Sequence, residues 1–136
     1  MAETPRKPIP RPYQDTQAYW DAAKQKRLIL QRCRDCQKFQ FYPRGVCSHC
    51  LGSALDWVDS PGRGVVHTFT IAHRAPHPGF ANQLPFVIGI IQLEEGVRMM
   101  TNIVGCDPNS VRIDMPVKVT FEEVSPDVTL PQFTPA

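Results

Sequence analysis

Apolar and polar residues alternate along two stretches in the second half of the chain. GVVHTFTIAHR, residues 64–74, and PVKVTFEEV, residues 116–124, both show this two-residue period. Because successive side chains of a strand point to opposite faces of a sheet, the pattern predicts half-buried β-strands. LPFVIGIIQLEEG, residues 84–96, is almost continuously apolar up to a Glu-Glu-Gly turn signal, and VRMMTNIVG, residues 97–105, follows it. This pair predicts a central strand that returns through a hairpin.

A further strand is indicated by LDWVDS, residues 55–60. Counting it, about five strands are joined by Gly-rich and Pro-rich turns, which suits a small OB-type barrel. We therefore predict a mainly β protein whose residues 55–136 form a five-stranded OB-fold domain with a C-terminal tail.

The N-terminal part of the chain follows a different pattern. Residues 1–14 contain four of the fourteen prolines and have no apolar periodicity, so we expect an extended arm. Residues 15–32 then predict a short helix and a strand that leads into the cysteine-rich segment. Asp15 or Thr16 is a plausible N-cap of this helix. We expect its aromatic residues, Tyr19 and Trp20, to pack onto the body of the protein.

Four cysteines form two close pairs, Cys33 with Cys36 and Cys47 with Cys50. C-x2-C is the spacing of a knuckle, a tight turn in which two thiolates bind one ion, and two knuckles complete a tetrahedron. Four protein thiolates leave no open position for water or substrate. We therefore predict a structural Zn²⁺ in a ribbon over residues 33–54.

Two details of this metal site remain open in the sequence. The same tetrahedron of sulfurs accepts iron, so a rubredoxin-like iron site is the competing interpretation. His49 lies between Cys47 and Cys50, where the turn should point its side chain outward. It is not included among the predicted ligands.

Composition and charge narrow the classes of function. The 136 residues are 42% hydrophobic and 21% charged, typical of one globular domain, and the net charge of +2 is far from that of a dedicated nucleic-acid binder. The first residues lack the apolar core of a signal peptide, and the longest apolar run is too short to cross a bilayer. We expect a cytoplasmic protein, where paired cysteines favour a metal over disulfides.

The combination of these motifs resembles a known family. The resemblance covers roughly residues 13–135 and rests on the four cysteines together with GRG, GF, TN, GCDP and a late MPV, all in the same order along the chain. On these segments the chain is similar to the DUF35 family. That resemblance implies a rubredoxin-like zinc ribbon followed by an OB-fold domain, with an association with acyl-CoA.

The resemblance also implies a function. Members of the family resemble small partners of thiolase-fold enzymes: thiolases, acyltransferases and aldolases that shorten CoA-linked side chains. In such complexes the thiolase-like subunit carries the nucleophile, and the DUF35 subunit helps to hold CoA. We therefore expect a non-catalytic CoA-binding or acyl-CoA-binding subunit of a hetero-oligomer.

Basic residues are the candidates for contacts with the phosphates of CoA. The glycines beside Arg63 could allow a ligand close to the backbone, and the proline-rich loop of residues 73–85 has the character of a recognition surface. The predicted CoA-binding residues are Arg63, His73, Arg74, Lys24 and Arg27, and Lys26, between the last two, is a further candidate. The predicted partner contacts are Phe80, Pro78, Leu130 and Phe133. A plain surface loop and a tail packed on its own barrel are the alternatives.

No catalytic constellation is evident in the sequence. It contains no G-x-S-x-G elbow, and Cys106, the one thiol outside the pairs, follows an apolar strand as a buried hydrophobe would. Two other functions stay open. Zinc ribbons and OB barrels also bind single-stranded nucleic acid, although the predicted strands offer few basic residues, and an iron-loaded ribbon could carry electrons.

Overall fold

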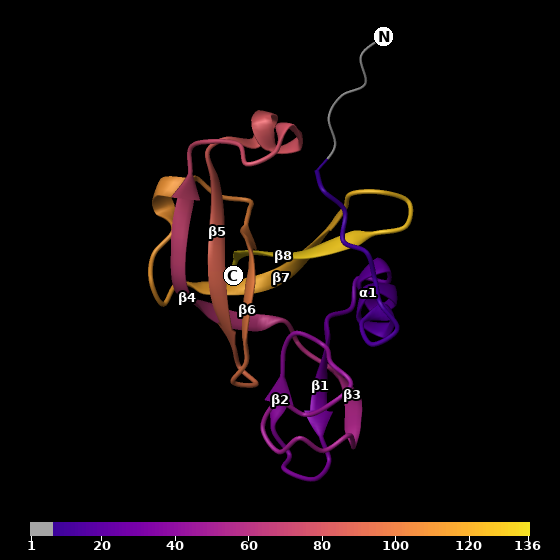
Figure 1. Ribbon diagram of the computed structural model, residues 1–136. Coiled ribbons are helices and arrows are strands. Elements are labelled where there is room, and N and C mark those ends of the chain that lie inside the picture. The colour runs from indigo at the N-terminus through magenta and orange to yellow at the C-terminus, as the bar shows by residue number, and fades with distance from the viewer. Residues whose placement is uncertain (1–6) are drawn as a thin grey trace.

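The computed structural model describes residues 7–136 and consists of a small ribbon sheet, a closed barrel and one helix beside both (Figure 1). Helix α1 covers Gln17–Lys24. The ribbon sheet contains β1 (Ile29–Cys33), β2 (Phe39–Gln40) and β3 (Leu55–Asp59) in the order β2-β1-β3. The barrel contains β4 (Arg63–Ala72), β5 (Phe86–Leu93), β6 (Arg98–Ile103), β7 (Pro116–Glu123) and β8 (Thr129–Pro135). Two short 3₁₀ helices, η1 (Pro78–Gln83) and η2 (Pro108–Ser110), lie in its loops.

The barrel closes in the order β4-β5-β6-β8-β7. Strand β5 pairs along its length with β4 on one side and β6 on the other, so it is the central strand that its apolar sequence predicts. Its odd positions from Val87 to Leu93 are buried and its even positions are half-buried. A bulge in β4 between Val66 and Thr68 shifts the register against β5. The predicted class, mainly β with an N-terminal helix, a zinc ribbon and a five-stranded barrel, is confirmed.

Two strands take different places from those predicted. Strand β3 pairs with β1 in the ribbon sheet, from Ile29 opposite Asp59 to Cys33 opposite Leu55. The fifth barrel strand is instead β8, in the segment predicted to be a tail. Its side chain Phe133 is fully buried in the core, so the prediction that it contacts a partner is wrong.

The prolines of β8 explain why this segment lacks the pattern of a barrel strand. Proline has no N–H to donate and is excluded from the middle of most sheets. Strand β8 pairs with β7 over its whole length but with β6 only through Ile103 and Phe133. Because β8 pairs with β6 at a single position, most of its β6-facing edge needs no backbone N–H donors. Pro131 and Pro135 are therefore tolerated in β8.

Helix α1 connects the ribbon to the barrel through its contacts with β1 and β8. Thr16 is its N-cap residue and uses its side chain on the preceding turn, where Thr16 Oγ1 accepts from the backbone N–H of Tyr13 at 2.8 Å. Tyr19 and Trp20 are buried in the common core, as predicted. Helix α1 thus joins the two sheets into one hydrophobic core.

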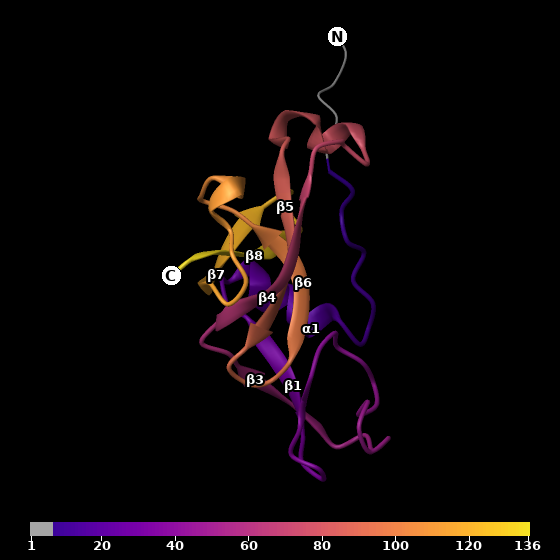
Figure 2. The same cartoon turned by 90° about the vertical axis from the view of Figure 1, so that its left-hand side faces the viewer.

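The first part of the chain descends from the η1 end of the barrel to α1 (Figures 1 and 2). Residues 1–6 of the predicted arm lie outside the described residues. Lys7 Nζ forms an ion pair with Glu122 at 3.0 Å and lies 5.8 Å from the centre of the Phe80 ring. Gln132 Nε2 donates to the same carboxylate at 2.6 Å. The arm is therefore fixed at Lys7 to β7 and η1. In the part of the chain that the structure describes, no helix combines the length and apolar character needed to cross a bilayer.

Candidate metal centre and ligand groove

The two cysteine pairs sit in turns of the same geometry. In each turn, the N–H of the first cysteine donates to the carbonyl five residues later, at 3.0 Å for Cys33 and 2.7 Å for Cys47. The N–H four residues later donates back to the first cysteine, from Gln37 at 2.8 Å and from Leu51 at 3.0 Å. Gln37 and Leu51 also share a positive φ, 61° and 64°. The sequence therefore folds into two equivalent knuckles that face each other.

The four cysteine sulfurs form a compact cluster. The Sγ atoms of Cys33, Cys36, Cys47 and Cys50 all lie within 4.8 Å of one another, and the contacts Cys33–Cys50 and Cys36–Cys47, one sulfur from each knuckle, are 3.6 Å long. Sulfurs held about 2.3 Å from a tetrahedral zinc are about 3.8 Å apart. The donor set and its spacing therefore fit zinc. Among residues 7–136, the five cysteines form no disulfide.

His49 lies outside the sulfur cluster, as predicted. Its ring nitrogen Nε2 is 3.2 Å from the carbonyl oxygen of Phe39, and its side chain is exposed. Its backbone N–H points at Cys47 Sγ, 3.4 Å away. His49 thus contributes a backbone donor to the site and no ligand atom.

Backbone donors make the cluster favourable for thiolates. The N–H groups of Cys50 and His49 lower the pKa of the Cys47 thiol to about 6. The N–H of Gly52 lowers the pKa of the Cys50 thiol. The neighbouring thiols, that of Cys33 first, and burial outweigh this effect and raise the pKa of Cys50 to about 12. Ionisation of one sulfur therefore opposes ionisation of the next, and a divalent cation at the centre removes this conflict.

Two buried glutamines hold the second knuckle against the first. Gln31 on β1 accepts from the backbone N–H of Arg44 and donates to its carbonyl, both at 2.8 Å. Gln40 on β2 donates to Gln31 at 2.6 Å and accepts from the N–H of Ser48 at 2.7 Å. These amides satisfy the backbone of residues 44–48, which has no strand partner of its own. Their role is not predictable from the sequence, because glutamine in a strand gives no signal of burial.

Next to the ribbon, four aromatic rings connect α1 with the segment after β2. Tyr19 contacts Trp20, Phe41 and Tyr42 with ring centres 5.0 to 5.7 Å apart. Trp20 Nε1 donates to Tyr42 Oη at 2.9 Å. Burial raises the pKa of the Tyr19 hydroxyl well above its usual range. These contacts fix the position of Tyr42, which is 37% exposed.

Two open cavities lie along β6, and one of them is lined by this aromatic cluster. One, of about 320 Å³, lies between the helix and ribbon on one side and β6 and β8 on the other. The other, of about 250 Å³, lies between η1 and the outer face of β5 and β6. The linings of both cavities include Met100, Thr101 and Asn102. The two adjoining cavities are called here the Met100 groove, and their further lining residues include Trp20, Tyr42, Phe80, Phe86, Ile88 and Leu130.

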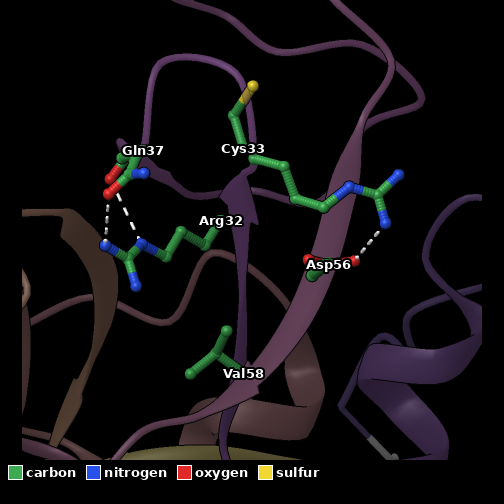
Figure 3. A pocket seen from close by; sticks show the side chains of 6 residues that line it. Arg32, Cys33, Gln37, Asp56 and Val58 are labelled. Atoms are coloured by element: carbon green, nitrogen blue, oxygen red, sulfur yellow. Dashed lines mark hydrogen bonds and ion pairs between the residues drawn. The ribbon is translucent and has the colours of Figure 1, made fainter.

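A third cavity, of about 220 Å³, lies on the ribbon sheet beside Cys33 (Figure 3). Its two guanidinium groups are already paired, Arg32 with Gln37 at 3.2 Å and Arg34 with Asp56 at 3.1 Å. The carboxylate of Asp56 lies in the same cavity and repels an anion. This cavity is therefore a poor site for the phosphates of CoA.

Comparison with known proteins identifies the family. Residues 20–56 match the model of the ChsH2 rubredoxin-like zinc ribbon domain, and residues 57–122 match that of the ChsH2 C-terminal OB-fold domain. A DUF35 domain-containing scaffold protein of Methanocaldococcus jannaschii is 38% identical over 101 residues, which are 74% of this chain and 71% of the relative. The chain belongs to the DUF35 family.

Other relatives are longer proteins or parts of complexes. The chain is 39% identical to a probable enoyl-CoA hydratase alpha subunit of Thermomonospora curvata over 96% of its own length, but it spans only 40% of that relative. A 3-oxo-4,17-pregnadiene-20-carboxyl-CoA hydratase alpha subunit of Mycobacterium tuberculosis is 36% identical over 89% of this chain and 38% of the relative. Among solved structures, a chain of an Ltp2-ChsH2(DUF35) aldolase matches with a TM-score of 0.83 and 39% identity, covering 93% of this chain and 98% of that chain.

The DUF35 fold separates the predicted CoA-binding residues into two groups. Arg63 begins β4, and His73 and Arg74 follow its end. Ten residues of strand span roughly 30 Å, so Arg63 and Arg74 cannot hold the same pyrophosphate. Lys24 ends α1 and Arg27 pairs with Asp59 at 2.6 Å, which puts both near the ribbon. His73 and Arg74 are exposed and precede the loop that lines the Met100 groove.

The glycines beside Arg63 have a different role from that predicted. Gly62 has a positive φ of 69°, and a Cβ there would collide with the side chain of Val119. A Cβ at Gly64 would collide with the carbonyl oxygen of Gln92. Both glycines therefore permit close packing of β4 against β7 and β5. They are not evidence of a ligand at Arg63.

The predicted partner residues have unequal exposure. Phe80 is half-buried and stacks on Phe86 with ring centres 5.2 Å apart, and Pro78 is exposed at the start of η1. Leu130 is half-buried and lines the Met100 groove. Cys106 is half-buried against the barrel core. Tyr42 and Met100 were not among the predicted site residues, because neither belongs to a recognisable motif.

Proposed function

We propose that this DUF35 chain is a non-catalytic subunit that binds acyl-CoA for a thiolase-like partner enzyme. The observation that carries the proposal is the open Met100 groove, apolar and bordered by aromatic rings, in a chain whose clustered thiols form a closed metal site. A groove of this kind can hold a ligand against a second protein surface. The partner would supply the nucleophile.

In this proposal zinc has a structural role. Cys33, Cys36, Cys47 and Cys50 would occupy all four positions of a tetrahedral ion, which leaves none for a substrate. The ion, when bound, contributes folding free energy to a ribbon that has only three short strands. The ribbon in turn holds Tyr42 beside the groove.

The relatives support a role within an acyl-CoA enzyme. Two are named as alpha subunits of CoA-thioester hydratases, and one solved relative is part of an aldolase complex. All three names describe part of an enzyme that has several subunits. The named reactions differ, because two are hydratases and one is an aldolase. A subunit that positions the thioester while another chain performs the chemistry accounts for this variety.

The η1 end of the Met100 groove is the proposed place for CoA and the partner. His73 and Arg74 would pair with the phosphates, because they are the basic residues adjoining the loop that lines the groove. Pro78 and Phe80 would contact the partner from η1. Arg63, Lys24 and Arg27 lie away from this end and are expected to contribute little.

Substitutions of Arg74 and Arg63, at opposite ends of β4, are expected to have different effects on the KM for acyl-CoA. In the assembled complex, Arg74→Ala should raise the KM for acyl-CoA about tenfold with little change in kcat, because a charged contact with a phosphate is lost in ground and transition states alike. Arg63→Ala is the matched control and should leave both constants unchanged. Steady-state kinetics with purified complexes measures this. Equal effects of the two substitutions, or none from Arg74→Ala, would contradict the proposed CoA position.

A further inference from the structure

Met100 is an unusual residue for the outer face of a barrel. Its side chain is 72% exposed, although it is large and apolar, and it lines both cavities of the groove. Ile90, its partner in register on β5, and Ile88, one pleat further, are half-buried on the same face. An apolar strip therefore runs across the outer face of β5 and β6 from η1 toward α1.

The walls at both ends of this strip are held in place by contacts of their own. At the η1 end, the ring of Phe80 stacks on Phe86 at 27° between the planes and is covered by Lys7. At the other end, the hydrogen bond from Trp20 fixes Tyr42. Because these side chains are already ordered, a ligand in the groove loses little binding free energy to their rearrangement.

Tyr42 is one of the polar residues at the end of the groove beside the ribbon. Tyr42 Oη accepts a hydrogen bond from Trp20, and its own hydrogen has no acceptor among residues 7–136. Tyr42 lines the cavity and is partly exposed, so this hydrogen can be donated to a carbonyl or hydroxyl oxygen of a ligand.

The part of the groove floor that β5 forms favours a hydrocarbon over a peptide. Strand β5 is paired on both sides in a closed barrel, so it presents no free N–H or C=O groups to a further strand. An extended peptide lying on it would lose hydration of its amides without replacement hydrogen bonds. A hydrocarbon chain or fused ring has no such cost.

We infer that the Met100 groove binds the acyl group of the thioester, and that it selects a long or bulky apolar acyl group with an oxygen near Tyr42. This inference rests on the proposed function for the source of the acyl group. The recognition itself depends on the apolar lining of the groove and on Tyr42, and not on His73 or Arg74, the proposed phosphate contacts.

Thioesters of N-acetylcysteamine test the groove without CoA. Titration of the full chain with the acetyl, hexanoyl and decanoyl thioesters, followed by calorimetry, should give affinities that rise with chain length. In a groove open on one side, a gain of about twofold per methylene is expected, so the decanoyl thioester, which has about eight more methylenes, should bind roughly 250-fold more tightly than the acetyl one. Affinities that do not change with length would overturn the inference.

A pair of substitutions locates the binding. Met100→Glu should weaken binding of the decanoyl thioester about tenfold or more and leave the melting temperature unchanged, because the side chain is exposed. Ile113→Glu is the matched control, since Ile113 is 56% exposed and lines neither cavity of the groove. Equal affinities of the two variants for the decanoyl thioester would place the ligand elsewhere.

The same titrations separate this inference from the proposed function. If decanoyl-CoA binds no more tightly than the decanoyl thioester of N-acetylcysteamine, the proposed CoA contacts are wrong while the acyl groove stands. If CoA adds affinity but chain length does not, the CoA contacts stand and the acyl groove is wrong.

Discussion

Replacing Cys47 by serine is expected to abolish metal binding and unfold the ribbon. Cys47 is fully buried, its Sγ receives the N–H of His49, and its carbonyl and N–H close the second knuckle. Structural zinc contributes roughly 10 kcal/mol to the folding of small zinc domains, so loss of one thiolate removes a large part of the stability of the ribbon. We expect the midpoint of thermal unfolding to fall by about 10 °C or more.

The control for this substitution is Cys106→Ser. Cys106 is the one cysteine outside the sulfur cluster, so its variant should keep one zinc per chain and an almost unchanged midpoint. Metal analysis by mass spectrometry also separates zinc from the rubredoxin-like iron alternative, which would give a coloured protein. A Cys47→Ser protein with full zinc occupancy and normal stability would show that the cluster is not the metal site.

Replacing Phe133 by alanine is expected to destabilise the barrel by about 3 to 5 kcal/mol. Phe133 is the largest fully buried side chain and sits in β8 at the register where β6 and β7 both pair with it. Removing the ring leaves a cavity at the point where the barrel closes. Leu130→Ala, at a half-buried position of the same strand, should cost markedly less.

Urea unfolding of both variants measures this difference. A barrel strand and an appended tail predict opposite results, because a tail that only reaches toward a partner would tolerate the loss of its aromatic residue. If Phe133→Ala were as stable as the unaltered chain, the assignment of β8 to the barrel would be wrong.

Local sequence patterns predicted most of the helices and strands, but not which strand each one pairs with. Alternation located β4 and β7, the Glu-Glu-Gly signal located the β5–β6 hairpin, and the spacing of the cysteines located the two knuckles. Strand β3 has a strand sequence, yet nothing in LDWVDS states whether it pairs with the ribbon or the barrel. Pairing is decided by contacts between distant segments, here between β3 and β1.

Prediction of the ligand site was limited by the same lack of distance information. Arg63 and Arg74 were grouped by charge, although the strand predicted between them already separates them by roughly 30 Å. The Met100 groove brings together Trp20, Tyr42 and Met100 from three separate elements. Exposed methionine and tyrosine are common on protein surfaces, so only the fold identifies them as a groove.

The most direct test of the central claim is reconstitution with a catalytic partner. The chain and the thiolase-like protein encoded nearest to it would be purified separately and together, and acyl-CoA turnover would be measured for each chain alone and for the mixture. The proposed function predicts no turnover by this chain alone, a stable complex of the two chains, and turnover that depends on the presence of both. Turnover by this chain alone, or a partner that fails to bind it and keeps its full rate without it, would contradict the account.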